Sequence, residues 1–198
     1  TMTQFALVPL FDWVAALACW STSLWRGPRP LPRWFVLDRA LSYVFIFPLG
    51  VLGLWAFIVH VMFPVRAAAA IGWPPSPFQF EVGYANLGIG LASLYAAFTT
   101  FYARVAVAIA ASCFLVGSGI GHVHDILAYG NLTAGNAGPI LVTDFLTPAM
   151  ALGLLIASAR RPKGKPRSPD SQALEAEIEV ARGAMRSYRE ALDRFVKG

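Results

Sequence analysis

Apolar residues occur in long runs along this chain, and short polar or proline-containing stretches separate the runs. A helix needs roughly 20 apolar residues to cross a bilayer. Five runs approach that length and predict transmembrane helices. They are Phe5–Trp25, Leu41–Phe63, Val82–Phe101, Val105–His122 and Pro139–Ala159. The expected fold class is therefore all-α, a polytopic membrane protein whose five transmembrane helices occupy residues 1–160.

The third and fourth runs are almost continuous, because only Tyr102-Ala103-Arg104 separates them. A single helix of about 40 residues is too long for one bilayer, so a break is predicted at Arg104. Further along, Gly117 and Gly121 form a GxxxG pattern. Such a pair typically permits close approach of a neighbouring helix, and packing is the expected role of these glycines.

After residue 160 the chain changes character. Residues 161–170 form a basic, proline-containing linker, and residues 171–198 predict a cytoplasmic amphipathic or coiled-coil helix. Its apolar positions alternate at spacings of four and three, which is a heptad seam. They are Leu174, Ile178, Ala181, Met185, Tyr188, Leu192 and Phe195. The seam is compatible with a helix on the membrane or on its own bundle, and with a homo-oligomer or a larger membrane complex.

Composition supports the membrane assignment and excludes other classes. Of the 198 residues 57% are apolar and 14% charged, whereas soluble domains carry about 25% charged residues. Two cysteines exclude a disulfide-stapled domain. No cleavable signal peptide is expected. The formal charge of +5 does not indicate nucleic acid, because the basic residues flank apolar runs or lie in the tail. The lipid bilayer is the expected partner.

Basic residues also predict the orientation. With five spans, Arg66 lies alone on one side, and the other side carries Arg26, Arg29, Arg33, Arg39, Arg104, Arg160, Arg161, Lys163, Lys165 and Arg167. Cytoplasmic segments carry an excess of Lys and Arg. The N-terminus is therefore expected outside and the C-terminus in the cytoplasm.

Ionisable residues within the apolar part gather on one side of the predicted membrane. Every histidine, and every acidic residue near a span except Asp38, maps to the outer side. They are Asp12, His60, Glu81, His122, His124, Asp125 and Asp144. Ionisable groups at membrane depth are costly and point to function by default. Glu81 has the alternative role of stabilising a helix N-terminus.

Two kinds of site fit these residues. Ser118, His122 and Asp125 share a helical face if the fourth span continues past Gly121. Because imidazoles and carboxylates bind divalent transition metals, a metal site is predicted at His122, His124, Asp125 and Asp144. A ligand pocket is predicted at Asp12, His60, Glu81, Tyr84 and Asp144.

Three stretches carry a resemblance to a family. Ile71–Leu87, Gly121-His122 and Gly135–Pro139 resemble a family of small uncharacterised bacterial integral membrane proteins, similar in layout to DoxX-like helical bundles. The resemblance covers roughly residues 40–160. It implies a multi-pass protein of the bacterial inner membrane, and it implies no catalytic residue.

The leading functional hypothesis is an outer-leaflet pocket that binds a metal or a lipid-soluble small molecule, such as a quinone or a lipid. Redox chemistry and metal-assisted hydrolysis are the candidate reactions if the protein is an enzyme, which stays open. The alternative is an accessory or assembly subunit of a larger membrane complex. A proton-coupled transporter is disfavoured, because the spans show no internal repeat.

Overall fold

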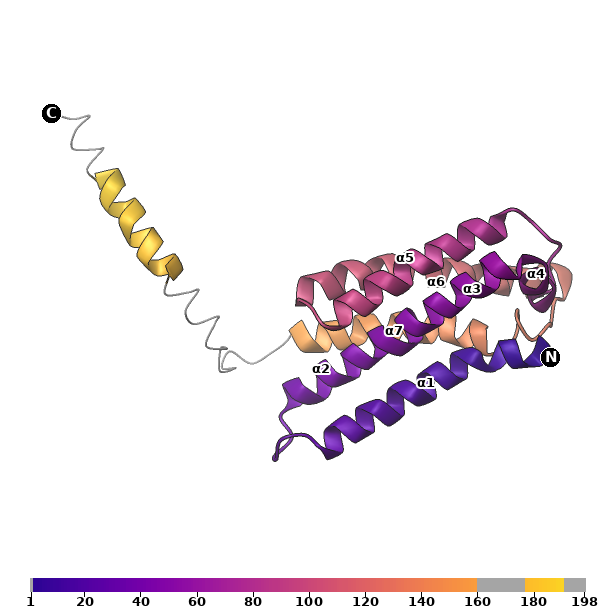
Figure 1. The fold of residues 1–198 in the computed structure, drawn as a ribbon, viewed down its shortest axis with the longest axis horizontal. Coiled ribbons are helices and arrows are strands. Elements are labelled where there is room, and N and C mark those ends of the chain that lie inside the picture. The colour runs from indigo at the N-terminus through magenta and orange to yellow at the C-terminus, as the bar shows by residue number, and fades with distance from the viewer. Residues whose placement is uncertain (1, 160–176, 191–198) are drawn as a thin grey trace. The chain divides into compact units, whose positions relative to one another are not determined.

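The computed structural model describes residues 2–159 and 177–190, and within these ranges it contains helices and no strands. The chain divides into two units, Thr1–Arg160 and Arg161–Gly198. In the first unit, α1 (Met2–Trp25), α5 (Phe78–Ala97), α6 (Phe101–Tyr129) and α7 (Pro139–Ala159) are separate long helices. A fifth long element is continuous from α2 (Arg33–Val44) through the π-helix η1 (Phe45–Val51) into α3 (Leu52–Met62). The short α4 (Pro64–Ile71) follows it (Figure 1).

Residues at the helix ends explain where the helices begin and end. The hydroxyl of Thr100 accepts from the backbone N–H of Ala103, so that it caps α6. Pro64 stands at the start of α4, where its missing N–H costs nothing. Gly72 and Gly130 end α4 and α6 with positive φ angles of 83° and 67°. Glycine adopts this left-handed conformation without the steric cost of a Cβ.

Four helices in the described ranges are long and apolar enough to cross a membrane. They are Leu7–Trp25, Arg33–Met62, Phe101–Tyr129 and Pro139–Ala159. These helices indicate a multi-pass membrane protein, as the sequence predicts. The predicted third span, now α5, is not among the four, since Gln79, Glu81 and Asn86 lower its hydropathy.

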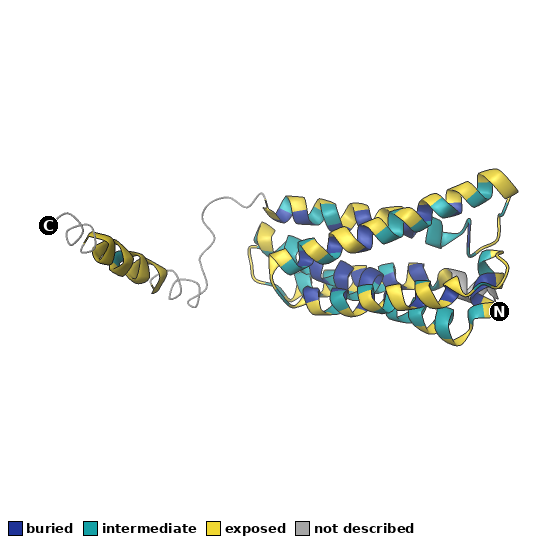
Figure 2. Cartoon of the chain, turned by 90° about the horizontal axis from the view of Figure 1, so that it is seen from above, coloured by how far each residue is buried: buried dark blue, intermediate teal, exposed yellow. Residues whose placement is uncertain are grey.

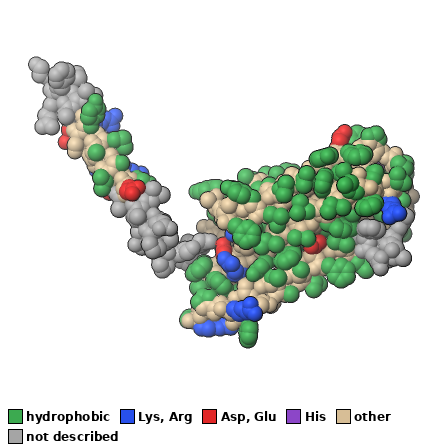
Figure 3. Space-filling model, viewed as in Figure 1, with side chains coloured by type: hydrophobic (Ala, Val, Ile, Leu, Met, Phe, Trp, Pro, Cys, Tyr) green, Lys and Arg blue, Asp and Glu red, His purple; other side chains and the backbone are tan. Residues whose placement is uncertain are grey.

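The outer surface of the bundle agrees with a lipid environment. Hydrophobic side chains cover most of the face seen in Figure 3, and many large ones are exposed on α1, α3 and α5, among them Phe11, Ile58 and Tyr95. Buried residues lie mainly between the helices of the bundle (Figure 2). In water such a surface would promote aggregation, but in a bilayer it faces acyl chains.

The break between α5 and α6 differs from the prediction. The turn lies at Phe98–Thr100, whereas Arg104 is inside α6 and only 8% exposed. Its guanidinium donates to the carbonyls of Ala96 and Ala97 at the end of α5, at 3.0 and 2.6 Å. A cation at a helix C-terminus is favourable. The sequence predicts a turn at Arg104 because it does not show that helix carbonyls are available to accept from the guanidinium.

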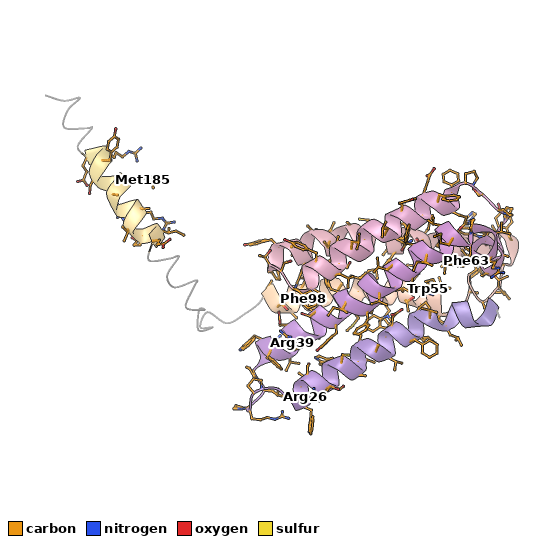
Figure 4. The ribbon with its side chains drawn as sticks, viewed as in Figure 1. Arg26, Arg39, Trp55, Phe63, Phe98 and Met185 are labelled. Carbon is orange, nitrogen blue, oxygen red and sulfur yellow. The ribbon has the colours of Figure 1, made fainter. Side chains whose placement is uncertain are left out.

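The same guanidinium also ties α6 to α2. It donates to Asp38 Oδ1 at 2.9 Å and to Ser42 Oγ at 3.0 Å. Arg104 therefore joins the beginning of α6 to the end of α5 and to α2. In Figure 4 Arg39 and Phe98 mark this end of the bundle, and Phe63 lies at the opposite end, beside α4.

Close packing between α3 and α5 depends on glycines that the sequence analysis did not single out for it. A Cβ at Gly53 would lie 3.0 Å from Asn86 O and 3.0 Å from the Cα of Gly90, and one at Gly90 would lie 3.1 Å from Gly50 O. The two backbones therefore touch at this crossing. The apolar core lies beside it, at the Arg104 end. It consists of Leu41, Val44, Phe45, Leu49, Ala96, Ala97, Ala108, Ala111, Ala151 and Leu155.

The second unit contains a helix over residues 177–190. Within this helix the seam positions Ile178, Met185 and Tyr188 are 42%, 65% and 73% exposed. Glu179 forms ion pairs with Arg182 and Arg186. Leu174, Leu192 and Phe195 lie outside the described residues, as does the predicted linker 161–170.

Candidate functional site

A cavity of about 780 Å³ occupies the half of the bundle nearest α4. The end of α3, the beginning of α5, the second half of α6 and the beginning of α7 meet there, because consecutive long helices run in opposite directions (Figure 1). Most lining residues are apolar, among them Leu52, Trp55, Val59, Phe114 and Ile140. The polar residues in the lining are His60, Arg66, Ser76, Gln79, Asn86, Ser118, His122 and Asp144.

Two glycines of α6 form part of the cavity wall. Gly117 and Gly121 line the cavity, and a Cβ built at either position would have no neighbour within 4 Å. The expectation that this GxxxG pair packs against a helix is therefore wrong. A small-residue spacing shows that one face of a helix is flat, but it does not show what lies opposite. Here the missing side chains leave open space.

His122 is held in one orientation by Asn136. The amide nitrogen of Asn136 donates to the backbone carbonyls of Asn131 at 2.9 Å and His122 at 3.4 Å. Its amide oxygen consequently faces Nδ1 of His122, at 2.7 Å. An amide oxygen can only accept, so the proton of the neutral imidazole resides on Nδ1. Asn136 itself is fully buried.

The other imidazole nitrogen faces Asp144. Nε2 of His122 lies 3.8 Å from Oδ2 of Asp144, and the two side chains are 8% and 3% exposed. That distance exceeds a hydrogen bond, and Oδ2 has no hydrogen-bond partner. Both residues line the cavity. The cavity therefore contains a buried acid and a buried base that a third atom can bridge.

A second histidine lines the same cavity from α3. Nδ1 of His60 lies 2.5 Å from Oε1 of Gln79, which is 4% exposed at the beginning of α5. His60 and His122 therefore share one arrangement, in which Nδ1 of the imidazole faces the oxygen of a side-chain amide. Such a partner orients the ring and selects its tautomer.

Trp73 covers His122 from the connection between α4 and α5. The two rings stack with centroids 5.9 Å apart. The indole N–H donates to Oδ2 of Asp125 at 2.9 Å, and Asn131 donates to the same oxygen at 2.5 Å. Asn131 also donates to the carbonyl of Ile71 at 2.8 Å. The α6–α7 loop therefore holds the α4–α5 connection against the cavity.

The structure brings together some of the predicted ligand residues and not others. His60 and Asp144 line the cavity, together with His122 from the predicted metal set. Glu81 and Tyr84 are exposed on α5 and are not in the lining, and Tyr84 packs edge-on against Phe57.

Asp12 is also outside the lining. Its side chain is nevertheless buried, at 6% exposure, and its Oδ2 has no hydrogen-bond partner. Asp12 therefore resembles Asp144 in burial and lack of a partner, but not in access to the cavity.

The four predicted metal ligands have separate surroundings. Asp125 receives the hydrogen bonds from Trp73 and Asn131, and His124 is exposed beside the ring of Tyr129. His122 and Asp144 remain as a pair. Within residues 2–159 and 177–190, three or more His, Cys, Asp or Glu side chains nowhere converge to hold a metal ion.

Sequence reasoning missed the two amides, Gln79 and Asn136. Both are polar residues next to apolar runs, and their importance comes from the histidines that they orient, 19 and 14 residues away. The available signal was weak. Asn136 lies in the Gly135–Pro139 stretch that carries the family resemblance, and Gln79 lies in Ile71–Leu87.

The chain belongs to a family of unknown function, DUF6790, whose model matches residues 6–164. The match covers the helical bundle and confirms the expectation of an uncharacterised family. No curated protein and no solved structure matches the chain.

Proposed function

We propose that the protein binds a lipid-soluble small molecule, of the quinone or lipid class, in the cavity between α3, α5, α6 and α7. The observation that carries the proposal is a cavity of about 780 Å³ with a mainly apolar lining and a buried His122–Asp144 pair. Pockets for small molecules commonly have about 300–1,000 Å³, apolar walls and a few convergent polar groups.

The distribution of polarity explains why the ligand would be amphipathic. Toward η1 the lining is apolar, with Pro48, Leu49 and Leu52, and toward α4 it contains the two histidines. A molecule with an apolar tail and a polar head matches this gradient. A hydrated polar metabolite does not, because its binding would require loss of water along the apolar part.

The proposal places the cavity in the outer leaflet of a bacterial inner membrane. In this proposal α5 also spans the membrane, as the third of five spans along the chain, which is supported by its 20 residues and its packing beside α3 and α6. The N-terminus is then outside and residues 171–198 are cytoplasmic. In favour of this orientation, Arg26, Arg33 and Arg39 lie at the end of the bundle opposite the cavity (Figures 1 and 4).

A substitution that fills the cavity tests the proposal. Gly121→Leu places a side chain in the open space beside the cavity wall, whereas Gly153→Leu places one in open space on α7 away from the lining. The full chain in detergent is titrated with 4-decylphenol and with decylubiquinone, and Tm is recorded. A ligand that binds only the folded protein raises Tm as its concentration increases.

We expect wild type and Gly153→Leu to show a saturable rise in Tm with at least one of the two compounds. Gly121→Leu should weaken that binding at least about tenfold, or about 1.4 kcal/mol. An absence of saturable binding in wild type contradicts the proposal. Equal affinity in wild type and Gly121→Leu contradicts it as well, since binding would then occur elsewhere.

A second function, that of an accessory subunit in a larger membrane complex, is favoured by the helix over residues 177–190. Its seam residues Ile178, Met185 and Tyr188 are exposed, and apolar residues at this spacing typically pack against another helix. This function and ligand binding are compatible. Removal of residues 171–198 tests it, because the deletion should lower the mass of the assembly in detergent.

A further inference from the structure

The hydrogen bonds around His122 and Asp144 determine how many protons the two side chains hold between them. Asn136 requires a proton on Nδ1 of His122 in every state, because its oxygen can only accept. Nε2 is then a bare acceptor in the neutral imidazole, or a donor in the imidazolium. Oδ2 of Asp144, 3.8 Å away, is buried without a partner.

An ionised Asp144 next to a neutral His122 would place the buried Oδ2 opposite the lone pair of Nε2, and no side chain or backbone N–H among the described residues donates to that oxygen. Burial of an unpaired charge is strongly unfavourable. The pair therefore retains one proton between Nε2 and the carboxyl group. Either a carboxylic acid faces a neutral imidazole, or a carboxylate faces an imidazolium. In both states the pair presents one hydrogen-bond donor and one acceptor to the cavity.

We propose that this pair recognises the hydroxyl group of a phenol or quinol head, in preference to the corresponding carbonyl or ether. The inference rests on the proposed function, since it names the chemistry of the ligand in that cavity. The hydroxyl oxygen accepts from the protonated member of the pair, and its hydrogen is donated to the unprotonated member. No bond other than these hydrogen bonds forms or breaks.

Two features of the pair favour a hydroxyl ligand. They are the distance between Nε2 and Oδ2 and the presence of both a donor and an acceptor. An oxygen atom about 2.8 Å from each partner bridges the observed gap of 3.8 Å between Nε2 and Oδ2. A carbonyl or ether oxygen can only accept, so that the acceptor of the pair would remain buried and unpaired. A site that is built to bind a hydroxyl discriminates strongly against an analogue that lacks it.

The test compares two ligands of nearly the same shape, 4-decylphenol and 4-decylanisole. The methyl ether keeps the ring and the tail but cannot donate a hydrogen bond. Dissociation constants are obtained with the full chain in detergent from the dependence of Tm on ligand concentration. We expect wild type to bind the phenol at least about tenfold more tightly than the ether.

Two variants locate the source of this preference. Asp144→Leu removes the carboxyl group from the cavity and should reduce the preference to about twofold or less. Asp12→Leu is the matched control, because Asp12 is also buried with an unpartnered oxygen but lies outside the lining. It should retain the full preference. If Asp144→Leu does not fold, His122→Phe takes its place, since a phenyl ring preserves the stacking against Trp73.

The outcomes separate this inference from the proposed function. Binding of both compounds with equal affinity, abolished by Gly121→Leu, overturns the hydroxyl preference and leaves the cavity as a binding site. A preference that persists in Asp144→Leu or His122→Phe overturns it too. Failure of both compounds to bind wild type, while decylubiquinone binds, overturns the hydroxyl inference and leaves the proposed function standing. If decylubiquinone fails as well, the proposed function is overturned and the inference falls with it.

Discussion

The indole N–H of Trp73 donates a hydrogen bond of 2.9 Å to Oδ2 of Asp125, across 52 residues of sequence. This contact joins the connection between α4 and α5 to the end of α6. The ring of Trp73 lies at the same time on the imidazole of His122. The two interactions together position a cover over the polar part of the cavity.

Loss of the Trp73 hydrogen bond should loosen this cover. Trp73→Phe preserves an aromatic ring against His122 but removes the donor. We expect a several-fold faster amide hydrogen exchange at Gly72, at position 73 and at Ser76, the positions of the connection that have a backbone N–H, because its opening requires fewer interactions to break. Exchange in α2 should be unchanged and serves as the internal control. Unchanged exchange in the connection would show that the hydrogen bond does not hold it.

A Cβ at Gly90 should separate α5 from the long helix that precedes it. Gly90→Ala places a Cβ 3.1 Å from Gly50 O and 3.1 Å from Leu54 N, so we expect destabilisation of about 1–3 kcal/mol. Gly88→Ala, two residues away on the same helix, meets open space and should be neutral or slightly stabilising. Thermal unfolding in detergent measures both. Equal Tm values for the two variants would contradict the close crossing.

Replacement of Arg104 should weaken the connection between α2, α5 and α6. Arg104→Leu leaves Oδ1 of Asp38 and the carbonyls of Ala96 and Ala97 without the donor that Arg104 supplies. We expect the free energy of unfolding to fall by about 3 kcal/mol. This is the lower end of the range for a broken buried ion pair, because Asp38 is partly exposed. Chemical unfolding in detergent measures the loss.

Arg39→Gln is the comparison for that experiment. Arg39 pairs with the same Asp38, at 3.1 Å, but its side chain is 42% exposed. An exposed ion pair contributes about 0–1 kcal/mol. Arg104→Lys should be intermediate, because an ammonium keeps the charge without the planar set of donors. A loss in Arg39→Gln as large as that in Arg104→Leu would refute the special role of Arg104.

A charge on the seam of the second unit should disrupt its association. Met185→Glu places a carboxylate in the seam, whereas Val180→Glu introduces the same residue at a position 74% exposed and outside the seam. If the seam packs against another helix, Met185→Glu should lower the assembled mass by light scattering at least about twofold, since a buried unpaired charge is costly. Val180→Glu should leave it unchanged. Identical masses for both variants and wild type would argue against the accessory-subunit function.

The sequence predicted which end of the bundle contains the histidines more successfully than it predicted their contacts. Counting spans places His60, His122 and Asp144 at one end, because each long apolar run reverses the direction of the chain. In the structure these three residues line one cavity. That Glu81 faces away from it depends on the rotation of α5, and hydrophobicity does not report this rotation when a helix is apolar on most sides.

Long-range contacts account for the other differences. Arg104 was expected in a turn, since an isolated arginine between two apolar runs typically marks one. Its acceptors include Asp38 and Ser42, which are 66 and 62 residues away. Likewise, Gly117 and Gly121 match a packing motif, and only the position of the neighbouring helices shows that no helix fills the space beside them. Local patterns contain no information on either point.

The π-helix η1 lies between two parts of one continuous helix that pack against different neighbours. Upstream, α2 packs against α1 and α7, and downstream α3 packs against α5. A residue added to a helical turn rotates everything after it by roughly 100°. The seven residues Phe45–Val51 therefore determine the direction in which His60 points around the helix axis, relative to Asp38. Removal of a single residue there would rotate α3 about its axis and turn His60 away from Gln79, although every side chain that touches the cavity would still be present in the chain.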